Sequence, residues 1–157
     1  MKFLTKVPKL TDIKLLRVRE KGDWKGFNAK AVGLMIKIGL LFKVKAAKRF
    51  MEEFATTIGD TIYRPRNRGK ISKSLLYHEG VHFWQEKNYK FYKTRYTLHR
   101  KSRLHFEAMA YAMQVAHFGT SLSDASKYLA DPIYALKIEP SRARTVIWIY
   151  VQKFLAV

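Results

Sequence analysis

Apolar residues recur every three or four positions along much of this chain, which is the pattern of amphipathic helices. Three long stretches show it: residues 45–55, about 72–88 and about 102–118. Gly119 follows the third stretch and is a typical residue for ending a helix. The middle of the chain is therefore predicted to be mainly helical.

Two further helices are predicted near the C-terminus. Ser121 is followed three residues later by Asp124, which resembles a capping box for a helix that ends before Pro132. Ser141 after Pro140 opens the final segment. Its apolar spacing fits a helix slightly better than a strand, although it is rich in β-branched residues.

The N-terminal half has a weaker pattern. Residues 56–64, TTIGDTIYR, place β-branched and aromatic residues around a Gly-Asp pair, which predicts a β segment. Residues 11–24 fit either a strand or a short helix, and Asn28 is a candidate cap for a helix to about Phe42. Residues 87–103 are predicted to be irregular. The expected fold class is α+β and mostly helical.

Length and composition indicate one folded domain. The chain has 157 residues, of which 48% are hydrophobic and 14% aromatic, enough to form a core. It has no internal repeat or low-complexity linker, so residues 1–157 are predicted to be a single domain, with 1–44 as a basic and apolar extension packed on a core of 45–157. The absence of cysteine excludes disulfides and cysteine-ligated zinc.

The charge predicts an anionic partner. Lys and Arg total 31 against 12 Asp and Glu, a net charge of +19. Residues 87–103 contain basic and aromatic residues and no acid, which suits non-specific contact with nucleic acid. The alternative is a solvated basic surface with buried rings, and an anionic membrane or an acidic protein is a further possible partner. The candidate anion-binding residues are Arg64, Arg66, Arg68, Lys87, Lys90, Lys93, Arg95, Arg100, Lys101 and Arg103.

The chain shows little sign of membrane insertion or secretion. The apolar run 31–42 is too short to span a bilayer and contains Lys37, so a core helix is expected, with a membrane-surface helix as the alternative. The first eight residues lack the apolar core of a signal peptide. These features predict a cytoplasmic or virion-associated protein, and contact of the run 31–42 with a membrane surface stays the alternative.

The stretch YHEGVHFWQ carries the clearest candidate chemistry. His78 and His82 are four residues apart, so on a helix both imidazoles lie on one face, as a zinc ion requires. Glu79 is about 100° further around the helix, where it can act as general base on a zinc-activated water. The alternative is a pair of hydrogen-bonded or exposed histidines.

A catalytic zinc usually needs a third protein ligand. The candidates are His99, His105, Glu107 and His117. Glu107 is preferred because it lies in the apolar run LHFEAMAY, where an unpaired carboxylate is unfavourable, and His105 is the second choice. The alternative for Glu107 is a surface carboxylate close to an arginine.

His78-Glu79-x-x-His82, followed by a helix with Glu107, resembles the gluzincin branch of the zinc metallopeptidases. The metzincin pattern does not fit, because it requires a third histidine at residue 88, which is Asn here. Residues 46–117 are similar to small metallopeptidase domains of bacteria and phages. The resemblance implies a zincin-like fold in which His78, His82 and Glu107 bind zinc and Glu79 is base and acid. It also implies that the strand near 57–63 pairs with an extended peptide substrate.

Two functions are compatible with these features. The first is a zinc-dependent peptidase, phage-associated and acting near nucleic acid, in which Tyr111 on the face of Glu107 stabilises the oxyanion or supports a ligand. A core tyrosine is the alternative for Tyr111, and Gln85 is a candidate support for the ligands. The second function is a zincin-fold structural or DNA-binding protein of a virion or nucleoprotein assembly, with peptidase activity lost or incidental. The expected location is therefore cytoplasmic or virion-associated.

Overall fold

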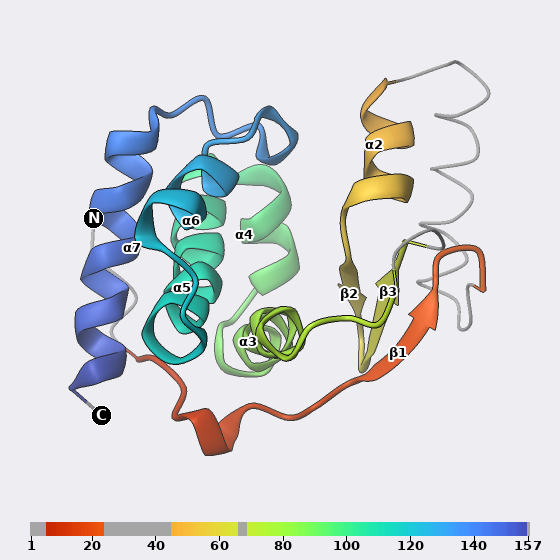
Figure 1. Cartoon of the computed structure of the whole chain (residues 1–157), viewed down its shortest axis with the longest axis horizontal. Helices are drawn as coiled ribbons and strands as arrows, with labels where there is room; N and C mark the ends of the chain where they lie inside the picture. Colours follow the sequence, from red (N-terminus) through yellow and green to blue (C-terminus); the bar gives the residue numbers. More distant parts are fainter. Residues whose placement is uncertain (1–5, 24–44, 66–68, 157) are drawn as a thin grey trace. The chain divides into compact units, whose positions relative to one another are not determined.

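Helices make up most of the described chain, which covers residues 6–23, 45–65 and 69–156 of this computed structural model (Figure 1). A small three-stranded sheet completes it, so the α+β, mostly helical class is confirmed. The chain divides into two units: Met1–Leu15 with Ser72–Val157, and Leu16–Ile71. The predicted single domain with an extension over 1–44 stays a prediction, because residues 24–44 lie outside the described part.

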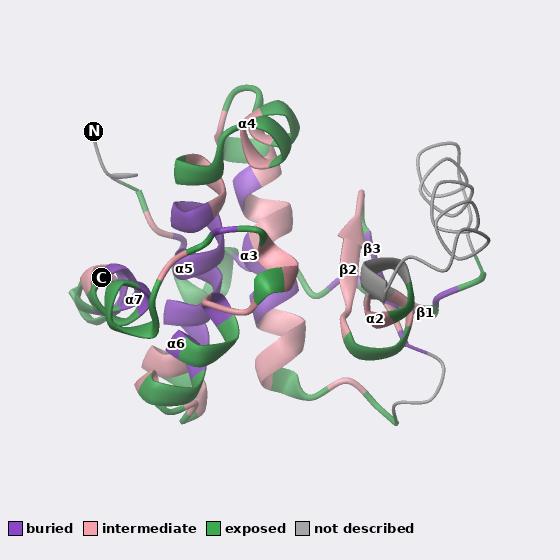
Figure 2. Cartoon of the chain, turned by 90° about the horizontal axis from the view of Figure 1, so that it is seen from above, coloured by how far each residue is buried: buried purple, intermediate pink, exposed green. Residues whose placement is uncertain are grey.

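The first unit is a helical bundle built around one buried helix. Helix α5 packs against α3, α4, α6 and α7. Every residue of α5 from Leu104 to Gln114 is buried (Figure 2). Such burial suits a helix with apolar residues on all sides and makes each polar residue in it conspicuous. The elements of this unit are η1 (Leu10–Asp12), α3 (Lys73–Asn88), α4 (Tyr92–Leu98), α5 (Arg100–Phe118), α6 (Leu122–Leu129), η2 (Pro132–Tyr134) and α7 (Pro140–Leu155).

The capping residues define the helix ends largely as the sequence predicts. Ser72 accepts the backbone N–H of Leu75 at 3.2 Å and caps α3, and Ser121 accepts that of Asp124 at 3.0 Å and caps α6. Gly119 ends α5 with φ of 71°, a conformation that glycine adopts without strain. The C-terminal segment is a helix, α7, as its apolar spacing favours.

The second unit contains the sheet. Its elements are β1 (Arg17–Glu20), α2 (Lys45–Glu53), β2 (Thr56–Ile58) and β3 (Thr61–Arg64). The predicted β segment 56–64 is a hairpin, with Gly59 at φ of 61° in its turn, and β1 adds to β3 in parallel. The ambiguous residues 11–24 contain both η1 and β1. The helix predicted over 28–42 lies outside the described residues.

The prediction of an irregular segment at 87–103 is wrong. Residues 92–98 form α4, with only a short connection on each side. Tyr92 and Tyr96 are four residues apart, so on this helix they share one face, and Tyr92 packs on Phe106 with ring centroids 4.7 Å apart. Burying that face stabilises a helix that the charges alone do not suggest. Phe91, in contrast, is 78% exposed.

None of the helices within the described ranges combines the length and the apolar character needed to cross a bilayer. The apolar run 31–42, on which the membrane question rested, lies outside those ranges.

Gly80, inside the His-Glu-x-x-His stretch, allows the N-terminal segment to lie against α3. A Cβ at this position would come within 2.4 Å of Ile13 Cγ2 and 3.3 Å of the Lys14 carbonyl oxygen. The same segment is held at Lys6, whose carbonyl accepts the Tyr89 hydroxyl at 2.8 Å. Only glycine fits at this position, because the N-terminal segment lies too close to α3 to leave room for a Cβ atom.

We expect Gly80→Ala to destabilise the protein by roughly 1–2 kcal/mol. The overpacking penalty of about 1–3 kcal/mol exceeds the gain of up to about 1 kcal/mol that alanine brings to a helix interior. Thermal unfolding of the metal-free protein measures the effect. Gly69→Ala is the matched control, because a Cβ there meets nothing within 4 Å. Equal stability of the two variants would contradict the close contact with Ile13.

Candidate metal centre

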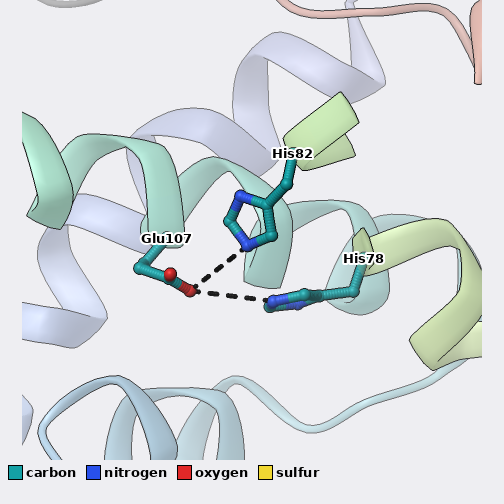
Figure 3. Close-up of side chains that lie close together, drawn as sticks. All are labelled: His78, His82 and Glu107. Carbon is teal, nitrogen blue, oxygen red and sulfur yellow. Dashed lines mark ion pairs between the residues drawn. The ribbon is translucent and has the colours of Figure 1, made fainter. Parts of the chain in front are cut away.

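Helices α3 and α5 bring together the two histidines of the motif and the glutamate proposed as third ligand (Figure 3). Glu107 Oε2 lies 3.7 Å from His78 Nε2 and 3.5 Å from His82 Nε2. The candidate ligand atoms of these residues all lie within 4.8 Å of one another. This group can hold a metal ion.

The Glu107 carboxylate supports this assignment. Within the described part of the chain, Glu107 Oε2 is a buried oxygen without a hydrogen-bond partner, and the residue is 2% exposed. An unpaired buried acceptor is unfavourable by about 1–3 kcal/mol, and by more when it is charged. A positive charge beside this oxygen would offset the penalty, and either a metal ion coordinated by Glu107 and both histidines or, in its absence, a protonated His82 can supply that charge. Two imidazoles and a carboxylate suit several divalent transition metals, zinc among them.

A hydrogen-bond chain orients His78. Its Nδ1 lies 3.1 Å from Gln114 Oε1, and Gln114 Nε2 donates to Ser74 Oγ at 2.9 Å. Because the amide nitrogen is committed to the serine, the amide oxygen faces the ring and accepts from Nδ1–H. Nε2 is then the nitrogen whose lone pair faces Glu107, as a metal ligand requires.

His82 is oriented in the same way by a second glutamine. Its Nδ1 lies 3.0 Å from Gln85 Oε1, and Gln85 Nε2 donates to the Phe106 carbonyl at 2.9 Å. Gln85 is completely buried. Gln85 therefore contacts His82, one of the candidate ligands, and its bond to Phe106 ties α3 to α5.

Two tyrosines of α4 complete the surroundings of the cluster. The Tyr96 hydroxyl donates to Glu107 Oε1, and the Tyr92 hydroxyl lies 3.3 Å from His82 Nδ1. Sequence reasoning missed both, because it treated their segment as irregular; their spacing of four was the available signal. It also missed Gln114, although this residue follows Glu107 by two helical turns on the same face.

The titration of the cluster follows from burial and charge. Burial alone lowers the pKa of His82, but the Glu107 carboxylate, together with the charge of Glu79 and the contact with Gln85, outweighs burial and raises the pKa to about 9. Burial alone raises the pKa of Glu107, but the charge of His82, together with the contacts of both histidines, holds that pKa well below its usual range. Without a metal, the cluster is thus a buried ion pair at neutral pH.

We expect the metal-free protein to lose stability as pH rises from about 6.5 to 9. The pKa of His82 is higher in the folded state than the ordinary 6.5, so its contribution is complete below 6.5 and is lost as the pH passes about 9. The loss is at most roughly 3 kcal/mol. Thermal unfolding with a chelator measures it. The control variant His99→Gln replaces an exposed histidine and should show the same loss of stability. A stability that does not change between pH 6.5 and 9 in the unsubstituted protein would contradict the ion pair of His82 and Glu107.

The other histidines do not join the cluster. His105 is buried in α5 with its Nδ1 3.0 Å from the Tyr150 hydroxyl, and burial followed by the charge of Lys153 lowers its pKa. His99 is exposed between α4 and α5, and His117 is exposed with its ring near Phe154. Glu107 is therefore the third ligand candidate that the fold brings to the motif.

The two residues predicted to be catalytic are both buried close to the cluster. Glu79 is 6% exposed, and its charge contributes to the raised pKa values of His82 and Tyr96. The ring of Tyr111 packs edge-on against His78 with centroids 4.7 Å apart. The Tyr111 hydroxyl lies 2.8 Å from that of Tyr134, a residue of η2 that sequence reasoning did not identify.

The ten predicted anion-binding residues are scattered over different environments. Arg64 pairs with Glu20 at 2.6 Å, and Arg103 donates to three backbone carbonyls. Arg95 lies over the ring of Phe106, and Lys93 pairs with Glu86 at 2.8 Å. Arg66 and Arg68 lie outside the described residues. The exposed members are Lys87, Lys90, Lys93, Arg100 and Lys101.

Comparisons of this chain with protein families, curated proteins and solved structures found no match.

Proposed function

We propose that this protein is a zinc-dependent metallopeptidase with a zincin-like site, in which His78, His82 and Glu107 hold the ion. One observation carries the proposal: the buried Glu107 Oε2 has no hydrogen-bond partner and faces Nε2 of both histidines of a His-Glu-x-x-His motif. Bound zinc would lower the pKa of a coordinated water and polarise the substrate carbonyl.

The other residues have defined tasks in this reaction. Glu79 takes the proton of the attacking water and then delivers it to the leaving amine, as general base and acid. Gln114 and Gln85 hold the tautomers of the two histidines. Tyr96 donates to the second Glu107 oxygen, so Oε1 is fixed while Oε2 remains directed at the histidines.

Tyr111 is the proposed donor to the oxyanion of the tetrahedral intermediate. Burial first, and then the charge of Glu107, raise its pKa well above the usual range, so the hydroxyl stays protonated. If Tyr134 donates in the hydroxyl pair, the Tyr111 proton can point at the substrate oxygen.

The direct test is elemental analysis of purified protein together with a peptide-cleavage assay. We expect one zinc per chain and cleavage that stops when zinc is chelated. A protein that takes up no zinc at neutral pH would overturn the proposal.

A second candidate function, non-specific nucleic-acid binding, is favoured by the exposed lysines and arginines around α4. Lys90, Arg100 and Lys101 are exposed, and no acidic residue occurs between residues 87 and 103. The rings of Tyr92 and Tyr96 face inward to His82 and Glu107. Phosphate contacts rather than base stacking would therefore supply this binding.

We expect duplex DNA to bind with an affinity that falls steeply with salt and does not depend on sequence. Replacing Lys90, Arg100 and Lys101 by alanine should reduce the magnitude of the salt slope by up to about 3, roughly one for each phosphate contact. The control replaces Lys137, Arg142 and Arg144, which are also exposed, and changes the charge equally. DNA-binding titrations at several salt concentrations measure the salt slope of each variant. Equal slopes in both triple variants would contradict a site at α4.

A further inference from the structure

A pocket lies between the end of α4 and η2, next to the metal cluster. Its volume is about 270 Å³, and it is lined by Tyr96, Thr97, Arg103, Ile133 and Tyr134. The volume falls just below the roughly 300–1,000 Å³ of pockets for drug-sized ligands. It therefore suits one amino-acid side chain better than a larger molecule.

Two of the lining residues connect the pocket to the cluster. The Tyr96 hydroxyl donates to Glu107 Oε1, and its ring meets that of His82 edge-on. The Tyr134 hydroxyl pairs with Tyr111, whose ring packs on His78. A group bound in the pocket consequently lies within one side chain of the candidate ligands on both sides.

Arg103 holds the two walls together. Its guanidinium donates to the carbonyls of Tyr96 at 2.7 Å and Thr97 at 2.6 Å, at the end of α4, and to the carbonyl of Tyr134 at 2.9 Å, in η2. Carbonyls at the end of a helix otherwise lack partners, so a cation at this point also stabilises α4. These hydrogen bonds fix the shape of the pocket and place the positive charge of Arg103 on its wall.

We propose that this pocket is the specificity site of the peptidase and that it takes an aromatic side chain of the substrate next to the cleaved bond. The inference rests on the proposed peptidase function. Two tyrosine rings and Ile133 offer aromatic and aliphatic walls, on which a phenyl ring packs favourably. Arg103 already lies 5.8 Å from the Tyr96 ring centre, and its charge attracts an aromatic face and repels a lysine or arginine. None of the five lining residues is acidic.

Binding of single amino-acid derivatives tests the pocket without any cleavage. We expect the zinc-loaded protein to bind N-acetylphenylalanine amide at least tenfold more tightly than N-acetyllysine amide, as measured by NMR titration. Thr97→Trp, which fills the pocket from an exposed position at the end of α4, should weaken phenylalanine binding at least tenfold. Thr94→Trp is the matched control, because Thr94 is also exposed on α4 and does not line the pocket. The zinc content of each variant reports whether it is folded.

Cleavage of two peptides that differ only by Phe or Lys beside the scissile bond completes the test. We expect kcat/KM to favour Phe at least tenfold, and this preference to disappear in Thr97→Trp but not in Thr94→Trp. Cleavage without this preference would overturn the specificity site and leave the peptidase function intact. Phenylalanine binding that Thr97→Trp abolishes, in a protein that cleaves no peptide, would support the pocket and overturn the peptidase function. Equal binding of the two amides would overturn the pocket.

Discussion

The Glu79→Gln variant should keep its zinc and lose peptide cleavage. The substitution preserves the size of the side chain and one acceptor oxygen, but it replaces the carboxylate that takes the proton from water by a neutral amide. General acid–base groups contribute roughly 10²–10⁴-fold, so we expect kcat to fall by about that factor. Zinc content should remain one ion per chain, because Glu79 does not belong to the His78, His82 and Glu107 cluster.

Glu86→Gln provides the control for this experiment. Glu86 lies on the same helix, and its carboxylate pairs with Lys93 at 2.8 Å instead of facing the cluster. The control variant should cleave peptides at the rate of the unsubstituted protein. If Glu79→Gln cleaved equally well, Glu79 would have no part in the chemistry, whatever the metal content.

The second large effect is expected at Glu107. In the unsubstituted protein, free zinc at about 1,000 times its dissociation constant should stabilise the fold by about 4 kcal/mol and raise Tm by on the order of 10 °C. In Glu107→Gln this gain should fall below about 1.4 kcal/mol at the same zinc concentration, because removal of a direct ligand weakens zinc binding by more than the roughly 10–100-fold typical of groups that only support a ligand. Thermal unfolding with and without zinc measures both values.

The difference between the two unfolding curves is the decisive quantity. Metal-free Glu107→Gln also loses its ion pair with His82 and is expected to be less stable at neutral pH, so its absolute Tm is not informative. Glu139→Gln, at the exposed start of α7, removes the same charge away from the cluster and should keep the full zinc effect. An undiminished zinc effect in Glu107→Gln would exclude Glu107 as a ligand.

Local sequence patterns were sufficient for most of the helices. Ser72, Gly119 and Ser121 act within a few residues of themselves, so the limits of α3, α5 and α6 can be predicted without knowing what packs on them. Helix α4 could not be predicted in this way. Its stability comes from Tyr92 and Tyr96 packing on other helices. In the sequence, these contacts are indicated only by the spacing of four between the two tyrosines in a short basic segment.

The sequence by itself determined that two histidines of the candidate metal site lie together, and the tertiary structure decided which residues surround them. The spacing of His78 and His82 places both on one face of a helix, because helical geometry depends only on neighbouring residues. The sequence favoured Glu107 over His105 because an unpaired carboxylate is unfavourable in an apolar run. That Glu107 faces the two histidines was decided by how α5 is rotated against α3, which depends on the packing of the whole bundle. The same packing brings Gln114 and Tyr96 to the candidate ligands and forms the pocket at Arg103. These contacts join residues that are distant in sequence, so local patterns do not predict them.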